Sequence, residues 1–462
     1  MAIEQTASRF YNLERGKHGG LTCAIACLRE GLQVTMVEQA SELGEIGAGI
    51  QMPPNAVRVM DDFGLVEQLE KAGAVNISGH CLLKFSNGNS IARRPGHVWQ
   101  RKHFGQAWYV IHRADYHRVL REEATRLGAT IRLASEVISA DSKTTSVLLA
   151  SQERLYADII IGADGLRSVV RDEVLGYHVG PSDTGDLAYR ATFPKERVEA
   201  LDESLIEPSL RCWLGPYQHA VLYPVRGGAT YNLVLVCPDD LPPGVATEEG
   251  NTQEMRNLFK GWDPRQGYHE DNFDITLELT ILDRLTKMIA QVDNALKWKI
   301  CHMKELDTWC KRYPMQQYLM QIQGSIALLG DACHPTLPYQ AQGAAMAVED
   351  GAALGVLLGK LSRSDLNASK IPEVLQLYEL IRKQRTTINV QGAVANQKLY
   401  HMVDGPEADA RDEAFLHVDW ENPDHDFPFG WGNVGYLKRL MAFNATVDAG
   451  RQFDEWVAKI AK

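Results

Sequence analysis

The sequence lacks any hydrophobic run long enough to cross a bilayer. No apolar stretch approaches the roughly 18 residues that a membrane-spanning helix needs, although 45% of the 462 residues are hydrophobic. The first twenty residues also contain no apolar core of signal-peptide length. We therefore expect a soluble, cytoplasmic protein without a membrane span, with enough chain for two or three domains.

Basic clusters and metal-binding cysteine pairs are missing too. The formal net charge is −11, and no basic segment is interleaved with aromatic residues, which argues against nucleic acid as a partner. The eight cysteines are scattered without a CxxC pair, so the pattern predicts neither a zinc site nor a disulfide framework. We expect no metal, and the sequence leaves the oligomeric state open.

The most informative segment spans residues 328 to 354 and reads LLGDACHPTLPYQAQGAAMAVEDGAAL. A buried apolar run ends in Gly330-Asp331, a loop stiffened by two prolines follows, and a Gly/Ala-rich helix begins at about Gly343 and Ala344. Asp331 is therefore expected at the carboxyl end of a strand, where open α/β sheets bind their ligands. The helix start would direct unpaired N–H groups and a positive dipole at the same place.

This segment closely resembles the second FAD fingerprint of class A flavoprotein monooxygenases, the para-hydroxybenzoate and salicylate hydroxylase family, and in particular fungal salicylate-hydroxylase-like enzymes. The resemblance implies that Asp331 binds the ribityl chain of FAD and that the proline loop covers the isoalloxazine. It places the helix start beside the flavin, where its dipole would stabilise the negative charge of the reduced ring. It also implies NADH or NADPH as a transient reductant and O2 as the oxidant.

Three further positions carry the same resemblance. Residues 32 to 38 read as a parallel strand that stops on Glu38, whose carboxylate is the natural partner of the adenosine ribose. Arg113 opens a helix and would contact the flavin side of the cofactor. In ADIIIGADGLRSVVR, which spans residues 157 to 171, Asp164 would order the loop beneath the pyrophosphate. Either Arg167 or Arg171 would then supply positive charge near the phosphates and the nicotinamide cofactor.

The first phosphate loop of the family, GxGxxG after a hydrophobic strand, is present only in part. Residues 15 to 20 read RGKHGG, so Gly20 keeps the last glycine in register while Arg15 and Lys17 occupy the other two places. Side chains there cost backbone strain and block the approach to the pyrophosphate. The preceding ASRFYNLE is too polar for the centre of a parallel sheet. An extra segment near residues 266 to 284 is a second departure, and mistaken exon boundaries would produce both.

Alternating strand-like runs between residues 181 and 300 predict a sheet over the flavin. His219 and Tyr223, four residues apart on one such run, would point to the same face. Some pyridine- and benzoate-hydroxylating relatives place active-site His and Tyr residues on this strand, so we nominate His219 as base or proton relay and Tyr223 as substrate contact. Tyr339, in the loop over the flavin, is a further candidate for substrate contact. The alternative is a half-buried histidine beside a packing tyrosine.

We therefore predict an α/β fold with an α+β substrate layer. A discontinuous Rossmann-like FAD-binding domain would comprise residues 1–75, 101–180 and 301–360. An inserted mixed-sheet substrate domain would comprise residues 76–100 and 181–300, and a C-terminal helical region residues 361–462. The implied enzyme hydroxylates a phenolic or aromatic-acid small molecule through a C4a-hydroperoxyflavin. Alternatives are another flavin-fold oxidoreductase, such as an epoxidase or oxidase, and a cofactor-poor non-catalytic relative. The WxWxIP string of halogenases is absent, and so is the second nucleotide-binding glycine motif that Baeyer-Villiger enzymes need, which argues against both of these enzyme classes.

Overall fold

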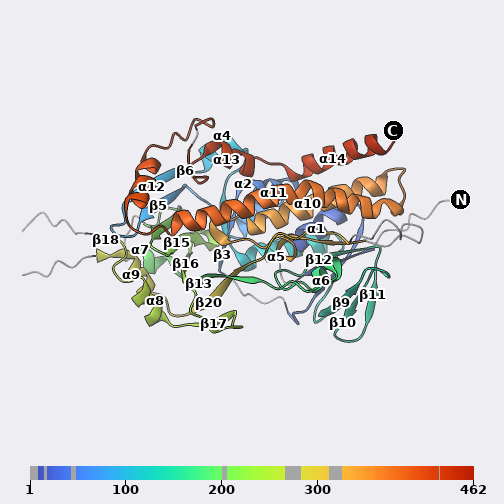
Figure 1. The fold of residues 1–462 in the computed structure, drawn as a ribbon, viewed down its shortest axis with the longest axis horizontal. Helices are drawn as coiled ribbons and strands as arrows, with labels where there is room; N and C mark the ends of the chain where they lie inside the picture. Colours follow the sequence, from blue (N-terminus) through green and yellow to red (C-terminus); the bar gives the residue numbers. More distant parts are fainter. Residues whose placement is uncertain are drawn as a thin grey trace, which may run out of the picture.

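A parallel sheet forms one end of the molecule in the computed structural model, which describes residues 9–14, 18–42, 48–199, 205–265, 282–311, 325–425 and 427–461 (Figure 1). Its five strands are all parallel to their neighbours. In sheet order they are β21 (Ile326–Leu328), β12 (Ile159–Ala163), β1 (Arg9–Glu14), β2 (Gln33–Glu38) and β8 (Thr130–Arg132). The carboxyl ends of β2, β12 and β21 therefore lie on one edge of the sheet. Glu38 ends β2, and Asp164 and Gly330-Asp331 come after β12 and β21.

Strand β1 corrects one expectation from the sequence. Residues 9 to 14 are too polar for a central parallel strand by composition, yet β1 lies between β12 and β2, with Phe10 opposite both Ile159 and Val34. Backbone pairing on two edges holds the strand in place, and main-chain hydrogen bonds do not depend on side-chain polarity. The expectation about this strand was wrong.

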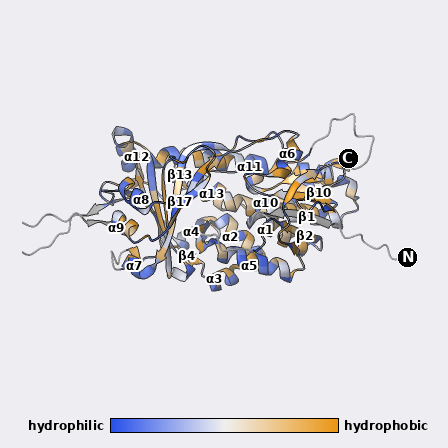
Figure 2. Cartoon of the chain, turned by 90° about the horizontal axis from the view of Figure 1, so that it is seen from below, coloured by the Kyte–Doolittle hydropathy of each residue, from blue (hydrophilic) through white to orange (hydrophobic). Residues whose placement is uncertain are grey.

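Helix α1 (His18–Arg29) and helix α10 (Gly343–Arg363) lie side by side in the interior (Figures 1 and 2). Their backbones approach closely at Gly351, where an added Cβ would lie 2.6 Å from the backbone nitrogen of Cys23 and 2.8 Å from the carbonyl oxygen of Gly19. Both partners are backbone atoms and cannot move aside alone. The contact therefore fixes how the starts of α1 and α10 face one another.

Gly351→Ala is expected to lower the free energy of unfolding by about 1 to 3 kcal/mol, the usual cost of overpacking. The steric cost outweighs the gain in helix propensity of about 1 kcal/mol. The matched control is Gly450→Ala in α14 (Ala445–Ile460), where the nearest atom, Cε of Lys360, would lie at an ordinary 3.5 Å. Urea denaturation should show loss only for the first variant, and equal stability of both would contradict this account of the helix contact.

The second large sheet is mixed and has eight strands, of which β14 and β5 run parallel and the other neighbours antiparallel. In sheet order they are β17 (Thr247–Gly250), β20 (Ala295–His302), β13 (Ser182–Pro194), β16 (Thr230–Pro238), β15 (Gln218–Val225), β14 (Leu210–Gly215), β5 (Gly79–Lys84) and β6 (Ser90–Pro95). One face packs on its own core around Trp213 and Tyr231, and the other faces the helices. Strands from two separate stretches of chain thus build one layer.

Helix α11 (Ile371–Tyr400) runs alongside α10 and joins the two sheet regions (Figure 1). The other helices are α2 (Pro54–Asp62), α3 (Val66–Lys71), α4 (His97–Phe104), α5 (Arg113–Arg126), α6 (Val169–Leu175), α7 (Lys195–Glu199), α8 (Thr252–Leu258), α9 (Arg284–Ala290), α12 (Pro406–Leu416) and α13 (Val434–Met441). The smaller sheets contain β3 (Gly49–Met52), β4 (Val75–Asn76) and β7 (Tyr109–His112), then β9 (Val137–Asp141), β10 (Ser146–Leu149) and β11 (Arg154–Tyr156), and the pair β18 (Pro264–Arg265) and β19 (Leu282–Asp283).

The predicted fold class is confirmed: a parallel α/β region, a mixed-sheet layer and a C-terminal helical region are all present. The division into three domains at the stated boundaries stays a prediction. No helix in the described ranges is both long and apolar enough to cross a membrane. The same residues contain no group of three His, Cys, Asp or Glu side chains placed to hold a metal ion.

Candidate active site

A large cavity separates the parallel sheet and its helices from the eight-stranded sheet. Its volume, counted as the space open to the centre of a water molecule, is about 310 Å³. One wall is formed by the starts of α1 and α10 and by the loop after β21. The opposite wall is the face of β13, β15 and β16. The cavity therefore lies at the carboxyl edge of the parallel sheet, where a ligand was predicted.

The first wall consists largely of small residues. Gly19 and Gly20 begin α1, Gly343 and Ala344 begin α10, and all four line the cavity. Gly19 leaves no space for a side chain, because an added Cβ would lie 2.6 Å from Cδ2 of Leu329. Two helix N-termini bordered by bare backbone suit an anionic, flat ligand, since backbone N–H groups at helix starts and the helix dipoles both favour negative charge. This wall therefore fits the pyrophosphate and flavin ring of FAD.

Five of the predicted cofactor residues come together on this cavity: Gly20, Arg113, Asp331, Gly343 and Ala344. Asp331 lies in the 3₁₀ turn η4 (Gly330–Ala332), directly after β21. Gly330 adopts a φ of +61°, a left-handed conformation that glycine tolerates best. The turn therefore presents the Asp331 carboxyl to the cavity at the position that the sequence predicted.

Two other predicted cofactor residues, Glu38 and Asp164, do not line the cavity. Glu38 is buried at the end of β2, and its Oε1 accepts a hydrogen bond from the Ala40 N–H at 2.9 Å. Asp164 follows β12 and accepts hydrogen bonds from the Ser168 hydroxyl (2.5 Å) and the Val169 N–H (2.7 Å). Asp164 therefore orders the turn into α6, whereas its place beneath a pyrophosphate stays a prediction.

The two arginines after β12 differ in their surroundings. Arg171 is fully buried, and its guanidinium donates hydrogen bonds to the carbonyls of Leu166, Val179 and Ala332. Its donors thus connect the loops after β12 and β21, which is a structural use of the charge. Arg167 is exposed, so it is the candidate that remains for the phosphate role. The replaced glycine positions, Arg15 and Lys17, and most of the extra segment near 266 to 284 lie outside the described residues.

Behind the start of α10 lies a buried cluster of charges. Arg382 of α11 donates to Asp350 Oδ1 and to Glu349 Oε2, both at 2.7 Å, and Arg385 contacts Glu349 at 2.7 Å. His334 Nε2 lies 2.6 Å from Asp350 Oδ2. Burial raises the pKa of the Asp350 carboxyl, but His334 and Arg382 oppose this and hold it below its usual value. His334 therefore connects the loop after β21 to α10.

On the opposite wall, His219 and Tyr223 point into the same cavity, together with Val221 between them. This confirms the shared face predicted from their spacing on β15. His219 is buried, and its Nδ1 lies 2.9 Å from Nε2 of His401, which caps the C-terminus of α11. His401 Nδ1 in turn lies 4.0 Å from Oδ2 of Asp186 on β13. Three ionisable side chains from three elements thus lead away from the cavity.

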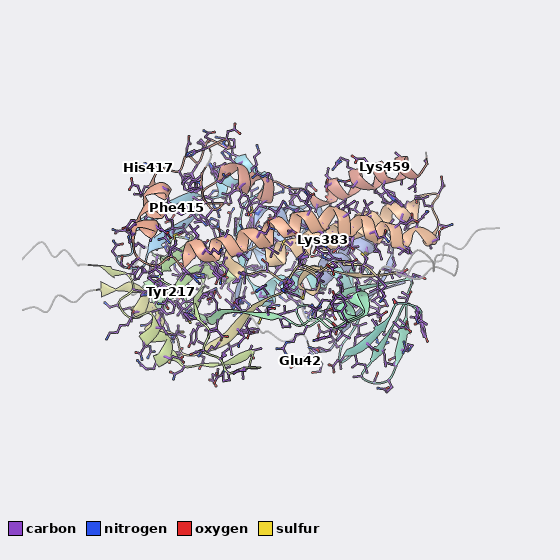
Figure 3. All side chains as sticks on the ribbon, in the orientation of Figure 1. Glu42, Tyr217, Lys383, Phe415, His417 and Lys459 are labelled. Atoms are coloured by element: carbon purple, nitrogen blue, oxygen red, sulfur yellow. The ribbon has the colours of Figure 1, made fainter. Side chains whose placement is uncertain are left out.

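The position of His401 is fixed by the turn between β14 and β15. Tyr217, labelled in Figure 3, lies in this turn with a φ of +60°, and its N–H donates to the His401 carbonyl at 3.2 Å. Burial lowers the pKa of His219 well below its usual value, and the neighbouring His401 lowers it further. Burial also lowers the pKa of His401, while Asp186 raises it. His219 is therefore a neutral imidazole at neutral pH.

The two nominated tyrosines make different contacts. Tyr223 packs against Gly49, where an added Cβ would lie 2.4 Å from Cε2 of the ring, and burial raises the pKa of its hydroxyl. Tyr339 is buried, and its hydroxyl donates to Asp186, while its ring centroid lies 5.2 Å from that of His219. The Tyr339 hydroxyl is thus engaged by Asp186, so any substrate contact falls to its ring.

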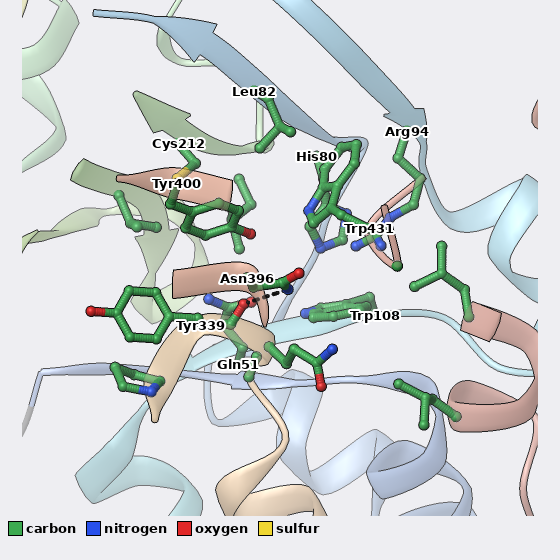
Figure 4. Close-up of a pocket in the computed structure, with 18 of the residues that line it drawn as sticks. Gln51, His80, Leu82, Arg94, Trp108, Cys212, Tyr339, Asn396, Tyr400 and Trp431 are labelled. Atoms are coloured by element: carbon green, nitrogen blue, oxygen red, sulfur yellow. Dashed lines mark hydrogen bonds between the residues drawn. The ribbon is translucent and has the colours of Figure 1, made fainter. Parts of the chain in front are cut away.

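A smaller chamber adjoins the large cavity and has a volume of about 70 Å³ on the same measure (Figure 4). The two share His219, Val221, Gln51, Pro338 and Ala341 as lining residues. The wall of the chamber also contains His80, Arg94, Trp108, Tyr400 and Trp431. None of these five residues was predicted from the sequence as part of the site, and neither was His401 or Asp186. For His80 the available signal was a histidine directly before the apolar residues CLL, whereas Arg94 stands next to Arg93 in SIARRP and had no such signal.

Comparison with known proteins agrees with this geometry. A family model described as "FAD binding domain" matches residues 17–269 and 283–393. The FAD-dependent monooxygenase OpS4 of Beauveria bassiana (strain ARSEF 2860) is 36% identical over 407 residues, covering 86% of this chain and 87% of its own length. The 3-hydroxybenzoate 6-hydroxylase of Polaromonas naphthalenivorans (strain CJ2) is 33% identical over 389 residues, covering 84% and 86%. A salicylate hydroxylase substrate complex has the same fold, with a TM-score of 0.70 at 21% identity, covering 95% and 98%.

Proposed function

Since the chain belongs to the FAD binding domain family and is an FAD-dependent aromatic monooxygenase, we propose that it hydroxylates a phenolic ring held against β15. His219 takes the phenolic proton. The observation that carries this proposal is the line of side chains from His219 through His401 to Asp186, which begins at the wall of the cavity. A phenolate ring is more electron-rich than a phenol, so removal of this proton activates the ring for oxygen transfer.

Asp331, Arg113 and the starts of α1 and α10 would hold FAD in the large cavity, with Glu38 toward the ribose. When bound, FAD supplies the redox chemistry, with NADH or NADPH as the reductant and O2 as the oxidant. The residues of the chain contribute position and charge. The small residues on the helix side leave space for a flat ring, while the β15 face opposite it holds the substrate.

The proposed proton transfer requires one particular tautomer of each histidine. If Nδ1 of His219 donates to Nε2 of His401, then Nε2 of His219 is the acceptor that remains for the phenolic proton. Nδ1 of His401 then carries its proton toward Asp186. After proton transfer, His219 is positively charged, and the Asp186 carboxylate stabilises that charge through His401. Asp186 is held in place by Gln397, whose Nε2 donates to it at 2.6 Å.

Asp331→Ala is expected to weaken FAD binding strongly. Each hydrogen bond to a charged carboxylate is worth about 1.5 to 3 kcal/mol, or roughly a ten- to hundredfold change in the dissociation constant. The control is Asp365→Ala, which removes an exposed carboxylate in the turn after α10. Absorbance of the purified proteins at the flavin band gives the FAD content. Equal flavin content in Asp331→Ala, the control and the parent would remove Asp331 from the cofactor site.

The proposed reaction is tested with a panel of phenols and hydroxybenzoates, following NAD(P)H oxidation and product mass in the same sample. Hydroxylation adds one oxygen atom to the ring, with NAD(P)H consumed in equal amount. An oxidase would consume NAD(P)H and return only peroxide, and an epoxidase would act on an alkene and leave every phenol unchanged. Either of these results across the panel would overturn the proposed function.

A further inference from the structure

The smaller chamber contains a buried cation, Arg94, that has no counter-ion among the described residues. Arg94 of β6 is 3% exposed, and within the described residues no carboxylate or carbonyl accepts a hydrogen bond from its guanidinium, whose Nε is buried without a partner. Burial lowers the pKa of Arg94 to about 10, so the side chain stays protonated at neutral pH. An uncompensated buried charge is costly, and proteins normally pair it with an anion.

Two tryptophans hold the Arg94 guanidinium in place. Its Cζ lies 5.1 Å from the ring centroid of Trp108 and 5.0 Å from that of Trp431, both within the range of cation–π attraction (Figure 4). An aromatic ring face attracts the cation without accepting a conventional hydrogen bond, so these two contacts leave the N–H donors of the guanidinium available. The guanidinium is therefore fixed in position, but none of the described residues accepts a hydrogen bond from it.

His80 adds a second side chain with unused polar atoms. It lies directly opposite Arg94 in the pairing of β5 with β6, so both side chains project from the same face of the sheet. Both ring nitrogens of His80 are buried, and so is the indole Nε1 of Trp108. None of the three has a hydrogen-bond partner in the part of the chain that the structure describes. A guanidinium, an imidazole and an indole N–H thus surround one small space, and each of them can donate a hydrogen bond.

We propose that this chamber binds the carboxylate of the substrate, so that the enzyme acts on aromatic acids whose charged group lies on Arg94 and His80. This inference rests on the proposed function for the position of the ring, because His219 and Val221 line both spaces. One water needs roughly 10 to 15 Å³ on this measure, so a chamber of about 70 Å³ has space for a carboxylate and its first carbons. A carboxylate accepts bidentate hydrogen bonds from a guanidinium, which a neutral amide group does not.

The test compares acids with neutral amides of the same shape. The full-length, FAD-loaded protein is titrated calorimetrically with 3-hydroxybenzoate and 3-hydroxybenzamide, and with 2-hydroxybenzoate and 2-hydroxybenzamide. At least one acid should bind about ten- to a hundredfold more tightly than its amide. Equal or weaker binding of both acids relative to their amides overturns the proposal, and so does the absence of binding by both acids.

The variant Arg94→Met should remove the preference for the acid while retaining the volume of the side chain. Arg93→Gln is the matched control, because this neighbouring arginine lies on the opposite face, is exposed and pairs with Glu207. Arg190→Gln tests a second arginine, which lines the large cavity, is half-buried and, within the described residues, has no hydrogen-bond partner for its Nε. The proposal is overturned if Arg94→Met keeps the acid preference, or if Arg190→Gln alone loses it.

Flavin content and melting temperature, measured for each variant, separate a local effect from misfolding. The comparison of acid and amide in the unaltered protein needs no variant, so the proposal remains testable if Arg94→Met does not fold. Calorimetry also separates the two proposals. If an acid binds tightly but is not hydroxylated, the carboxylate site is supported and the proposed reaction is opposed. If neutral phenols are hydroxylated and acids are not preferred, the proposed reaction is supported and the carboxylate site is opposed.

Discussion

His219→Asn is expected to retain FAD and to slow hydroxylation by roughly 10² to 10⁴, the usual contribution of a positioned general base. The asparagine fills a similar space and keeps a polar group next to His401, but it cannot accept the phenolic proton. The loss should be partly recovered at high pH, because a phenol with a pKa near 10 then ionises without help. Stopped-flow rates of product formation, with peroxide measured in parallel, give the size of the effect.

The matched control is His417→Asn, which changes an exposed histidine directly after α12 that pairs with Glu413. It should leave the rate and its pH profile unchanged. Asp186→Asn adds a second comparison. It leaves His219 unchanged but removes the negative charge that stabilises protonated His219 through His401. An unchanged hydroxylation rate in His219→Asn, with no increase in peroxide, would rule out the proton role and leave His219 as a packing residue.

Arg382→Met is expected to lower the free energy of unfolding by about 3 to 5 kcal/mol, because it leaves buried carboxylates without their partner. Arg382 is 1% exposed and contacts Glu349 and Asp350, both of which are fully buried. The loss should extend to FAD binding, since Asp350 also accepts the Gly330 N–H at 3.2 Å beside Asp331. Urea denaturation and the flavin content of the purified variant measure the two effects.

Arg363→Met is the control for this cluster, because Arg363 forms an exposed ion pair with Glu30. Surface pairs of this kind contribute about 0 to 1 kcal/mol. A similar small loss in both variants would mean that the buried cluster contributes no more than a surface pair, and that the start of α10 is held by packing alone. A large loss confined to Arg382→Met supports the cluster as the part that fixes the loop after β21.

Local sequence patterns determined the cofactor side of this protein. The order of apolar run, Gly330-Asp331, proline loop and small-residue helix specifies a strand, a turn and a helix, each of which forms from neighbouring residues. The same holds for Glu38 at the end of β2 and for Arg113 at the start of α5. The shared face of His219 and Tyr223 follows from the period of two in a strand. Composition led to a wrong prediction at β1, where a polar segment forms a central strand because its backbone pairs with strands on both sides.

The tertiary structure alone decided the substrate side. His219 and His401 are 182 positions apart and meet because α11 ends against the turn between β14 and β15. Arg94 meets Trp431 only after the C-terminal region folds over β6. Neither pair can be recognised from the sequence pattern. Each residue fits the pattern of its own helix, strand or loop, and that pattern does not depend on the distant partner. A sequence records local geometry at each position, whereas the contact of two distant side chains depends on how whole elements pack.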